Sequence, residues 1–156
     1  MMAHQQYRFH SNNKWFFVLL LLVAGLTTKA QDIPLTVIGN VTGVPTELKS
    51  SELISVLKGE RQRWSNGTKV SIYLMSTTTP AGQSTCKRVY NMSGNAVRRY
   101  WLLQTIGFKA DAPVFCNDVE DLERYVSQNP GAIGVMDKAS NKTGVITLLI
   151  DGKNTF

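Results

Sequence analysis

Histidine and cysteine are scarce in this sequence, and their positions limit the chemistry that it can carry. The 156 residues contain two histidines, His4 and His10, and two cysteines, Cys86 and Cys116. From residue 31 onward the chain therefore lacks the usual general base, the usual partner of a Ser or Cys nucleophile and the commonest zinc ligand. We expect no enzymatic activity, no metal site and no cofactor.

Long apolar runs are also scarce. The longest, residues 15–26, has 12 residues, whereas a helix that crosses a bilayer needs about 20. Arg8 and Lys14 precede this run, and Thr28 and Ala30 provide small residues before a cleavage point. The pattern predicts a signal peptide over residues 1–30, a periplasmic or secreted protein, and no stable membrane anchor after cleavage.

The positive charge of the chain falls when the predicted signal peptide is removed. The whole chain has a formal net charge of +6, and residues 1–30 carry three of its basic residues and no acidic one, which leaves +3. This is an ordinary surface balance, not the dense basic stripe that nucleic-acid binding requires, so we expect no nucleic-acid partner. Residues 31–156 are enough for a single domain with its own core.

The two cysteines leave two alternatives open. An exported chain reaches an oxidising compartment, where Cys86 and Cys116 can form one disulfide. In the other alternative they are two buried thiols that behave as small apolar side chains. Either role is structural.

Strand and helix patterns alternate along residues 31–156. Short β-branched and apolar stretches predict strands at 33–38, 70–75, 113–116, 132–136 and 145–150. Apolar residues at helical spacing, with capping residues or final glycines, predict helices at about 51–59, 83–91, 94–107 and 118–129. We expect Trp101, on the third helix, to lie in the core. The alternation predicts an α/β fold with a mostly parallel sheet of about five strands flanked by helices.

Five short motifs follow one another along the chain. They are residues 48–59 (LKSSELISVLKG), 64–67 (WSNG), 91–93 (NMS), 100–101 (YW) and 129–134 (NPGAIG). Their joint order, over residues 33–151, resembles that of the phosphate-binding proteins of bacterial ABC transporters, in the type II periplasmic-binding-protein superfamily. Members of that family close two lobes around an anion. This chain is long enough for one lobe, similar to the second, so the resemblance implies a single periplasmic-binding-protein-like lobe.

The polar loop after the second predicted strand is the candidate ligand site, because open α/β sheets bind ligands at the carboxyl ends of their strands. Free N–H groups at the start of the next helix can receive an anion there. The predicted ligand-binding residues are Ser76, Thr77, Thr78, Thr79, Gln83 and Ser84. In the resembling family this place holds an arginine and a Ser-Gly-Thr stretch, and neither is present in residues 75–82. In the alternative interpretation the loop binds no ligand and only caps the next helix, and Arg98 and Arg99 face solvent.

Two functions follow from these expectations. The resemblance implies an exported solute-binding-like protein for phosphate or another small anion, in ABC-type transport. The alternative is an interaction module of the cell envelope, in which the face that would meet the missing lobe contacts an envelope protein or a second copy of the chain. An exposed apolar patch along that face would favour the alternative.

Overall fold

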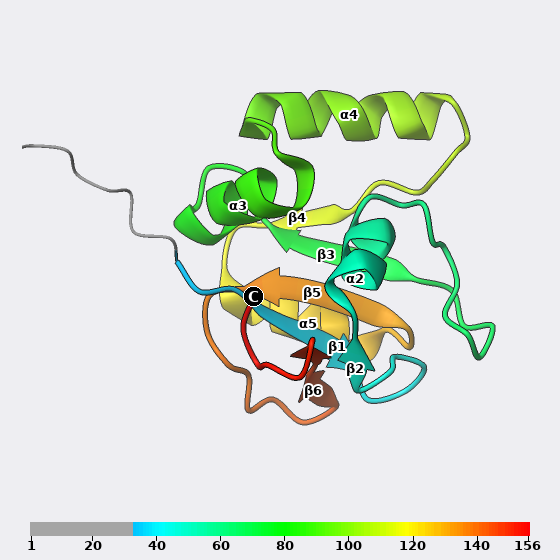
Figure 1. The fold of residues 1–156 in the computed structure, drawn as a ribbon, viewed down its shortest axis with the longest axis vertical. Coiled ribbons are helices and arrows are strands. Elements are labelled where there is room, and N and C mark those ends of the chain that lie inside the picture. Colours follow the sequence, from blue (N-terminus) through cyan, green and yellow to red (C-terminus); the bar gives the residue numbers. More distant parts are fainter. Residues whose placement is uncertain (1–32) are drawn as a thin grey trace, which may run out of the picture. The chain divides into compact units, whose positions relative to one another are not determined.

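Five strands form one sheet in the computed structural model, which describes residues 33–156 (Figure 1). They are β1 (Thr36–Asn40), β3 (Ser71–Met75), β4 (Val114–Cys116), β5 (Ala132–Met136) and β6 (Val145–Thr147), in the order β4-β3-β5-β1-β6. β3 pairs parallel with β4 and β5, and β1 pairs antiparallel with β5 and β6. Four strands therefore point the same way and β1 runs against them, which confirms the mostly parallel sheet.

Four α-helices lie within the described residues: α2 (Ser50–Leu57), α3 (Pro80–Thr85), α4 (Gly94–Ile106) and α5 (Val119–Gln128). A π-helical turn, η1 (Cys86–Tyr90), continues α3. The predicted signal peptide, residues 1–30, lies outside the described residues. None of the helices in the described part has the length and hydrophobicity that a bilayer-spanning segment requires.

The helix after the polar loop begins three residues earlier than the predicted start at Gln83. Thr79 is its N-cap, because the Thr79 side chain accepts a hydrogen bond from the Gly82 N–H, and Pro80 occupies its first turn. Proline suits that position, since its fixed φ is helical and it has no N–H to leave unpaired. Gln83 is therefore the fourth residue of α3, not the first.

The last predicted strand is wrong as a single element. Residues 145–150 split into β6 and β7 (Leu149–Ile150), and β7 pairs parallel with β2 (Glu47–Leu48), in a segment for which no strand or helix was predicted. Between them the Leu148 side chain is fully buried, and the Leu148 N–H donates to the Val37 carbonyl at 2.9 Å. The chain thus leaves one sheet for the other through a buried residue, which local sequence cannot reveal.

Helices cover both faces of the sheet. α5 packs against β1, β3 and β5, and its Tyr125 ring stacks on that of Tyr73 with centroids 5.4 Å apart. α3 also contacts β3 and β5, and in Figure 1 α2 and α3 lie in front of the sheet while α5 lies behind it. Residues 33–156 belong to one compact unit that contains the whole described core, so we expect this domain to fold without residues 1–30.

An aromatic cluster fastens α4 to the rest of the domain. Trp101 is 2% exposed, as predicted for a core residue, and its indole N–H donates to the Tyr90 hydroxyl at 3.1 Å. The Tyr90 hydroxyl in turn donates to the Leu57 carbonyl at the end of α2, and the Tyr100 hydroxyl to the Lys58 carbonyl at 2.7 Å. Burial raises the pKa of Tyr90 far above its usual value, so this hydroxyl stays protonated.

Both cysteines are buried free thiols in the structure. Burial raises the pKa of both thiols, and that of Cys116 reaches about 11. Only the thiolate attacks a thiol reagent, and at pH 8 a thiol with that pKa is about 0.1% ionised. We therefore expect neither thiol of the folded protein to react with dithionitrobenzoate at pH 8, and both to react in urea. If the unfolded, unreduced protein gave no thiol signal, the disulfide alternative would be the correct one.

Candidate functional site

The Ser76–Thr79 loop lies at the carboxyl end of β3, where the sequence placed the candidate site. The Ser76 N–H donates to the carbonyl of Cys116, the last residue of β4, at 2.7 Å. Since β3, β4 and β5 are parallel, their carboxyl ends share one edge of the sheet. The loop therefore occupies the edge at which open α/β sheets commonly bind ligands.

Hydrogen bonds within the loop use part of its polar surface. The Thr79 hydroxyl donates to the Ser76 carbonyl at 2.8 Å while it caps α3, and the Ser76 and Thr78 hydroxyls bond to each other at 3.0 Å. Gly82 lets α3 approach this loop closely, because a Cβ added there would lie 1.9 Å from the Ser76 carbonyl oxygen. The loop is thus held against the first turn of α3.

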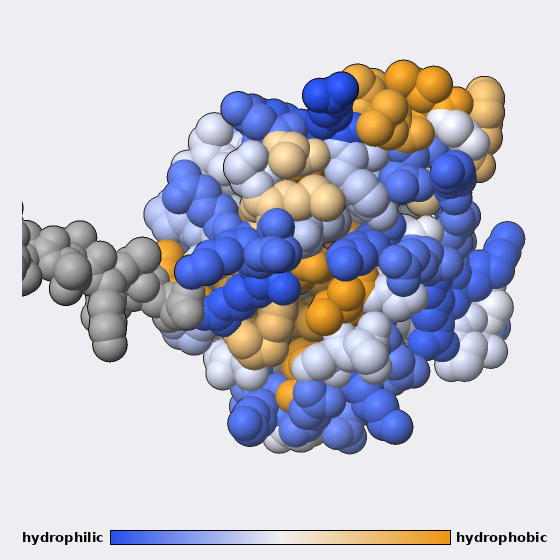
Figure 2. Space-filling model, turned by 45° about the horizontal axis from the view of Figure 1, so that its top comes forward, coloured by the Kyte–Doolittle hydropathy of each residue, from blue (hydrophilic) through white to orange (hydrophobic). Residues whose placement is uncertain are grey.

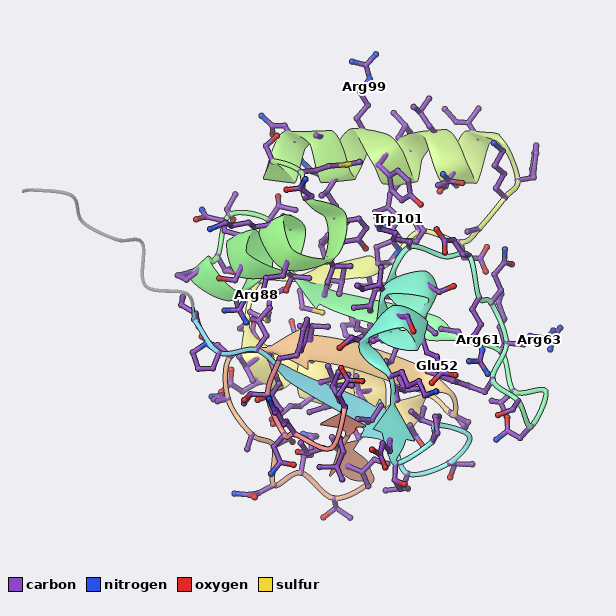
Figure 3. All side chains as sticks on the ribbon, in the orientation of Figure 1. Glu52, Arg61, Arg63, Arg88, Arg99 and Trp101 are labelled. Atoms are coloured by element: carbon purple, nitrogen blue, oxygen red, sulfur yellow. The ribbon has the colours of Figure 1, made fainter. Side chains whose placement is uncertain are left out.

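An arginine reaches the loop from a different helix. Arg98, on the second turn of α4, donates to the Thr77 hydroxyl oxygen at 2.6 Å, and its other terminal nitrogen donates to Asn95. Thr77 is 7% exposed, so its hydroxyl gives the guanidinium a fixed attachment point. Arg98 is exposed, as expected, but it also holds the loop through this contact, which was not expected. Arg99 does face solvent and points away from the domain in Figure 3.

These elements enclose an open pocket of about 330 Å³. It is lined by Thr77, Thr78, Gln83, Ser93, Gly94, Asn95 and Arg98. The structure therefore brings together three of the six predicted ligand-binding residues, Thr77, Thr78 and Gln83. Ser76, Thr79 and Ser84 do not line the pocket.

Four of the lining residues, from the first turns of α4, were not predicted from the sequence. The Ser93 hydroxyl caps α4 by accepting from the Ala96 N–H at 3.3 Å. Gly94 lets α4 approach the loop, because a Cβ there would lie 2.8 Å from the Cβ of Thr77. The predicted break between the helices at 83–91 and 94–107 falls at this position, and it was the one available signal that a second helix starts near the loop.

The charge of the pocket favours an anion. Among the described residues that line it, Arg98 is the only charged one, and none is Asp or Glu. Gly94 and Asn95 form the first turn of the 13-residue helix α4, where a helix offers its N–H groups no acceptor of its own and carries partial positive charge. A guanidinium has five N–H donors, so Arg98 has donors beyond those that bind Thr77 and Asn95.

Two further pockets have less to offer a ligand. One, of about 150 Å³, lies beside the amino end of β3. Both cations that line it are paired, Lys69 with Asp111 at 2.5 Å and Arg61 with Glu52 at 3.2 Å. The other, of about 320 Å³, is lined by Asp137 and Lys138, which carry opposite charges. Within residues 33–156, no group of three or more His, Cys, Asp or Glu residues is arranged to hold a metal ion.

The sheet order, the helices on both faces and the position of the pocket define one lobe of a periplasmic-binding-protein-like α/β fold. Solved structures bear this out. An ABC-type phosphate transport receptor from Vibrio cholerae has a TM-score of 0.61 and 13% identity, over 79% of this chain and 48% of that one. PstS from Borrelia burgdorferi has a TM-score of 0.57 and 15% identity, over 77% and 48%.

A third similar structure was solved with phosphate bound. It is described as a phosphate ABC transporter substrate-binding protein from Clostridium perfringens, and has a TM-score of 0.59 and 10% identity, over 77% of this chain and 46% of that one. This chain thus spans about half the length of the three proteins, which confirms the resemblance to a single lobe. No protein-family model and no curated protein matches the sequence. At these identities the likeness shows the fold alone.

Proposed function

We propose that this protein is an exported, non-enzymatic solute-binding-like domain that takes a small oxyanion, with phosphate as the leading candidate, beside Arg98 and Thr77. The observation that carries the proposal is the Arg98–Thr77 contact of 2.6 Å at the carboxyl edge of the sheet. It gives this loop a cation that the loop's own sequence lacks. The phosphate receptors with a similar fold support phosphate as the first anion to test.

The expected affinity of residues 31–156 is modest, because the pocket that they form is open to solvent on one side. A hydrogen bond to a charged group contributes about 1.5–3 kcal/mol, and a helix N-terminus about 0.3–1 kcal/mol. A few such contacts, reduced by the entropy cost of association, reach about 4 kcal/mol, which corresponds to a Kd of about 1 mM. Micromolar binding needs about 8 kcal/mol and would require a second surface that closes over the anion.

A titration of residues 31–156 tests the proposal. Backbone amide NMR shifts of Thr77, Thr78 and Gly94 should move with phosphate and saturate with a Kd of about 1 mM. The Arg98→Gln variant should bind about tenfold more weakly or worse, since it loses charge-assisted hydrogen bonds. Chloride at matched ionic strength should leave these shifts in place.

The neighbouring arginine provides the matched control. Arg99→Gln removes the same charge one residue away, from a side chain that points into solvent, and should leave the phosphate affinity within about twofold. Equal losses in the two variants would mean that only net charge attracts the anion. That result, or an absence of shifts at phosphate concentrations about ten times the expected Kd, would contradict the proposal.

In the alternative function, the face that would meet a second lobe contacts an envelope protein or a second copy of the chain. The positions of the exposed apolar residues do not favour this alternative. Four of the eight large apolar side chains that are exposed in residues 33–156 lie together on or just after the last turns of α4, whereas the pocket lies at the first turn of this helix. They are Leu102, Leu103, Ile106 and Phe108. Ile106 is about 18 Å along the helix from Gly94, at 1.5 Å per residue. This apolar patch is therefore remote from the sheet edge at which a second lobe would close the pocket.

A further inference from the structure

The outer side of α4 carries apolar side chains that contact no other part of the described core. Leu102 is 59% exposed, Leu103 61%, Ile106 65% and Phe108 98%. Together these four residues are the α4 patch, which appears as orange surface over the C-terminal end of α4 in Figure 2. The opposite side of the helix already fills the core with Val97 and Trp101. The patch is thus a second apolar face that the fold does not need.

Phe108 makes the patch more prominent. It follows α4 with a φ of 51°, a left-handed conformation that is unfavourable for a residue other than glycine. A phenylalanine that is 98% exposed in this conformation gains no packing in return. Its position is therefore better explained by a surface outside this domain than by the stability of the domain itself.

The charges on α4 and next to Phe108 are basic. Within residues 94–109 the charged side chains are Arg98, Arg99 and Lys109, and none is Asp or Glu, although Glu60 lies close enough to act on Tyr100 of the same helix. Arg99 precedes Leu102 and Leu103 by three and four residues, so it lies on the same side of the helix, and Figure 3 shows it pointing outward. Lys109 follows Phe108 and is exposed. The first acidic residue beyond, Asp111, is paired with Lys69 at 2.5 Å.

The combination of apolar and basic groups indicates which kind of surface can cover the α4 patch. A two-fold contact with a second copy would place the patch against itself, with cations on both sides and no carboxylate on α4 to pair with them. An anionic bilayer surface supplies both complements, since acyl chains accept Leu and Phe while lipid phosphates accept Arg and Lys. In Figure 1 α4 lies at the margin of the domain with its outer side uncovered, where a flat surface can reach it.

We propose that the outer face of α4 docks this domain onto an anionic lipid surface. The four apolar side chains enter the interface, and Arg99 and Lys109 pair with the phosphates of the headgroups. This docking goes beyond the anion pocket and does not depend on it, because none of the residues of the α4 patch lines that pocket.

Vesicle sedimentation of residues 31–156 tests this docking. The domain should sediment with vesicles of phosphatidylcholine and phosphatidylglycerol, and bind phosphatidylcholine alone about tenfold more weakly or worse. Phe108→Asp should lower the partition coefficient on the anionic vesicles about tenfold. Aspartate tolerates a left-handed φ, so this variant should fold. Val41→Asp, at an apolar residue that is 55% exposed outside the patch, is the matched control and should bind as the unaltered domain does.

Charge reversal tests the electrostatic contribution to vesicle binding separately from the apolar one. Arg99→Glu should weaken binding to the anionic vesicles about tenfold, while Lys142→Glu, the same change at an exposed residue far along the chain, should change it less than about threefold. Equal losses in both, no loss in Phe108→Asp, or no binding to the anionic vesicles would overturn the docking. So would a dimer in sedimentation velocity that Phe108→Asp abolishes, because the patch would then belong to a second copy. A failure of phosphate binding leaves all these readouts unaffected.

Discussion

Replacing Trp101 with alanine is expected to lower the free energy of unfolding by about 3–5 kcal/mol. The side chain is 2% exposed, and its ring makes edge-on contacts with those of Tyr90 and Tyr100, at centroid distances of 6.5 and 5.5 Å. Its removal also leaves the Tyr90 hydroxyl without the indole donor. Small domains have total stabilities of about 5–15 kcal/mol, so the variant should unfold at a much lower urea concentration.

The measurement is urea denaturation of residues 31–156, followed by circular dichroism. Leu102→Ala, at the next residue of α4, is the control, because its side chain is 59% exposed and should change stability by less than about 0.5 kcal/mol. Trp101→Phe should fall between the two, since it keeps a ring but loses the N–H donor. A loss below about 1 kcal/mol in Trp101→Ala would contradict the role of the aromatic cluster in holding α4.

Local sequence signals were sufficient where a single residue determines where a helix or strand begins or ends. Asp118 was predicted to begin a helix, and its side chain accepts from the Asp121 N–H at 2.8 Å as the N-cap of α5. The strand predicted at 132–136 has the observed bounds of β5. The order of strands and helices followed from such signals, and it was enough to predict the α/β class, whereas the single lobe was implied by the resemblance in the order of the motifs.

Features that depend on distant partners were not predictable from local patterns. The reversed direction of β1 is set by its neighbours β5 and β6, and the β2–β7 pair joins residues about a hundred positions apart. The same reason explains the missed arginine. Thr77 and Arg98 are 21 residues apart, and only the packing of α4 against the loop brings them together. A search for a cation within the loop itself could not find it.

A second large effect is expected for Gly82→Ala. The substitution should lower the free energy of unfolding, whereas glycine-to-alanine changes in helices usually raise it. Within a helix this substitution ordinarily stabilises a protein by about 0.5–1 kcal/mol, because alanine restricts the unfolded chain more than glycine does. Here the new Cβ would lie 1.9 Å from the Ser76 carbonyl oxygen and 2.7 Å from that of Met75. Both contacts are with backbone, which cannot rotate away as a side chain can. We therefore expect a loss of about 3 kcal/mol in urea denaturation.

The clash should also move the candidate site, because the Ser76 carbonyl that the Cβ would displace holds the Thr79 hydroxyl and the Thr79 N–H. A shift of this turn carries Thr77 away from Arg98, so phosphate binding should weaken together with stability. Gly107→Ala is the control: Gly107 has an ordinary φ of −78°, and its added Cβ would come no closer than 3.2 Å to a neighbour. Its stability should change by less than about 1 kcal/mol. If Gly82→Ala proved as stable as this control, α3 would not be held against the loop as closely as the structure has it.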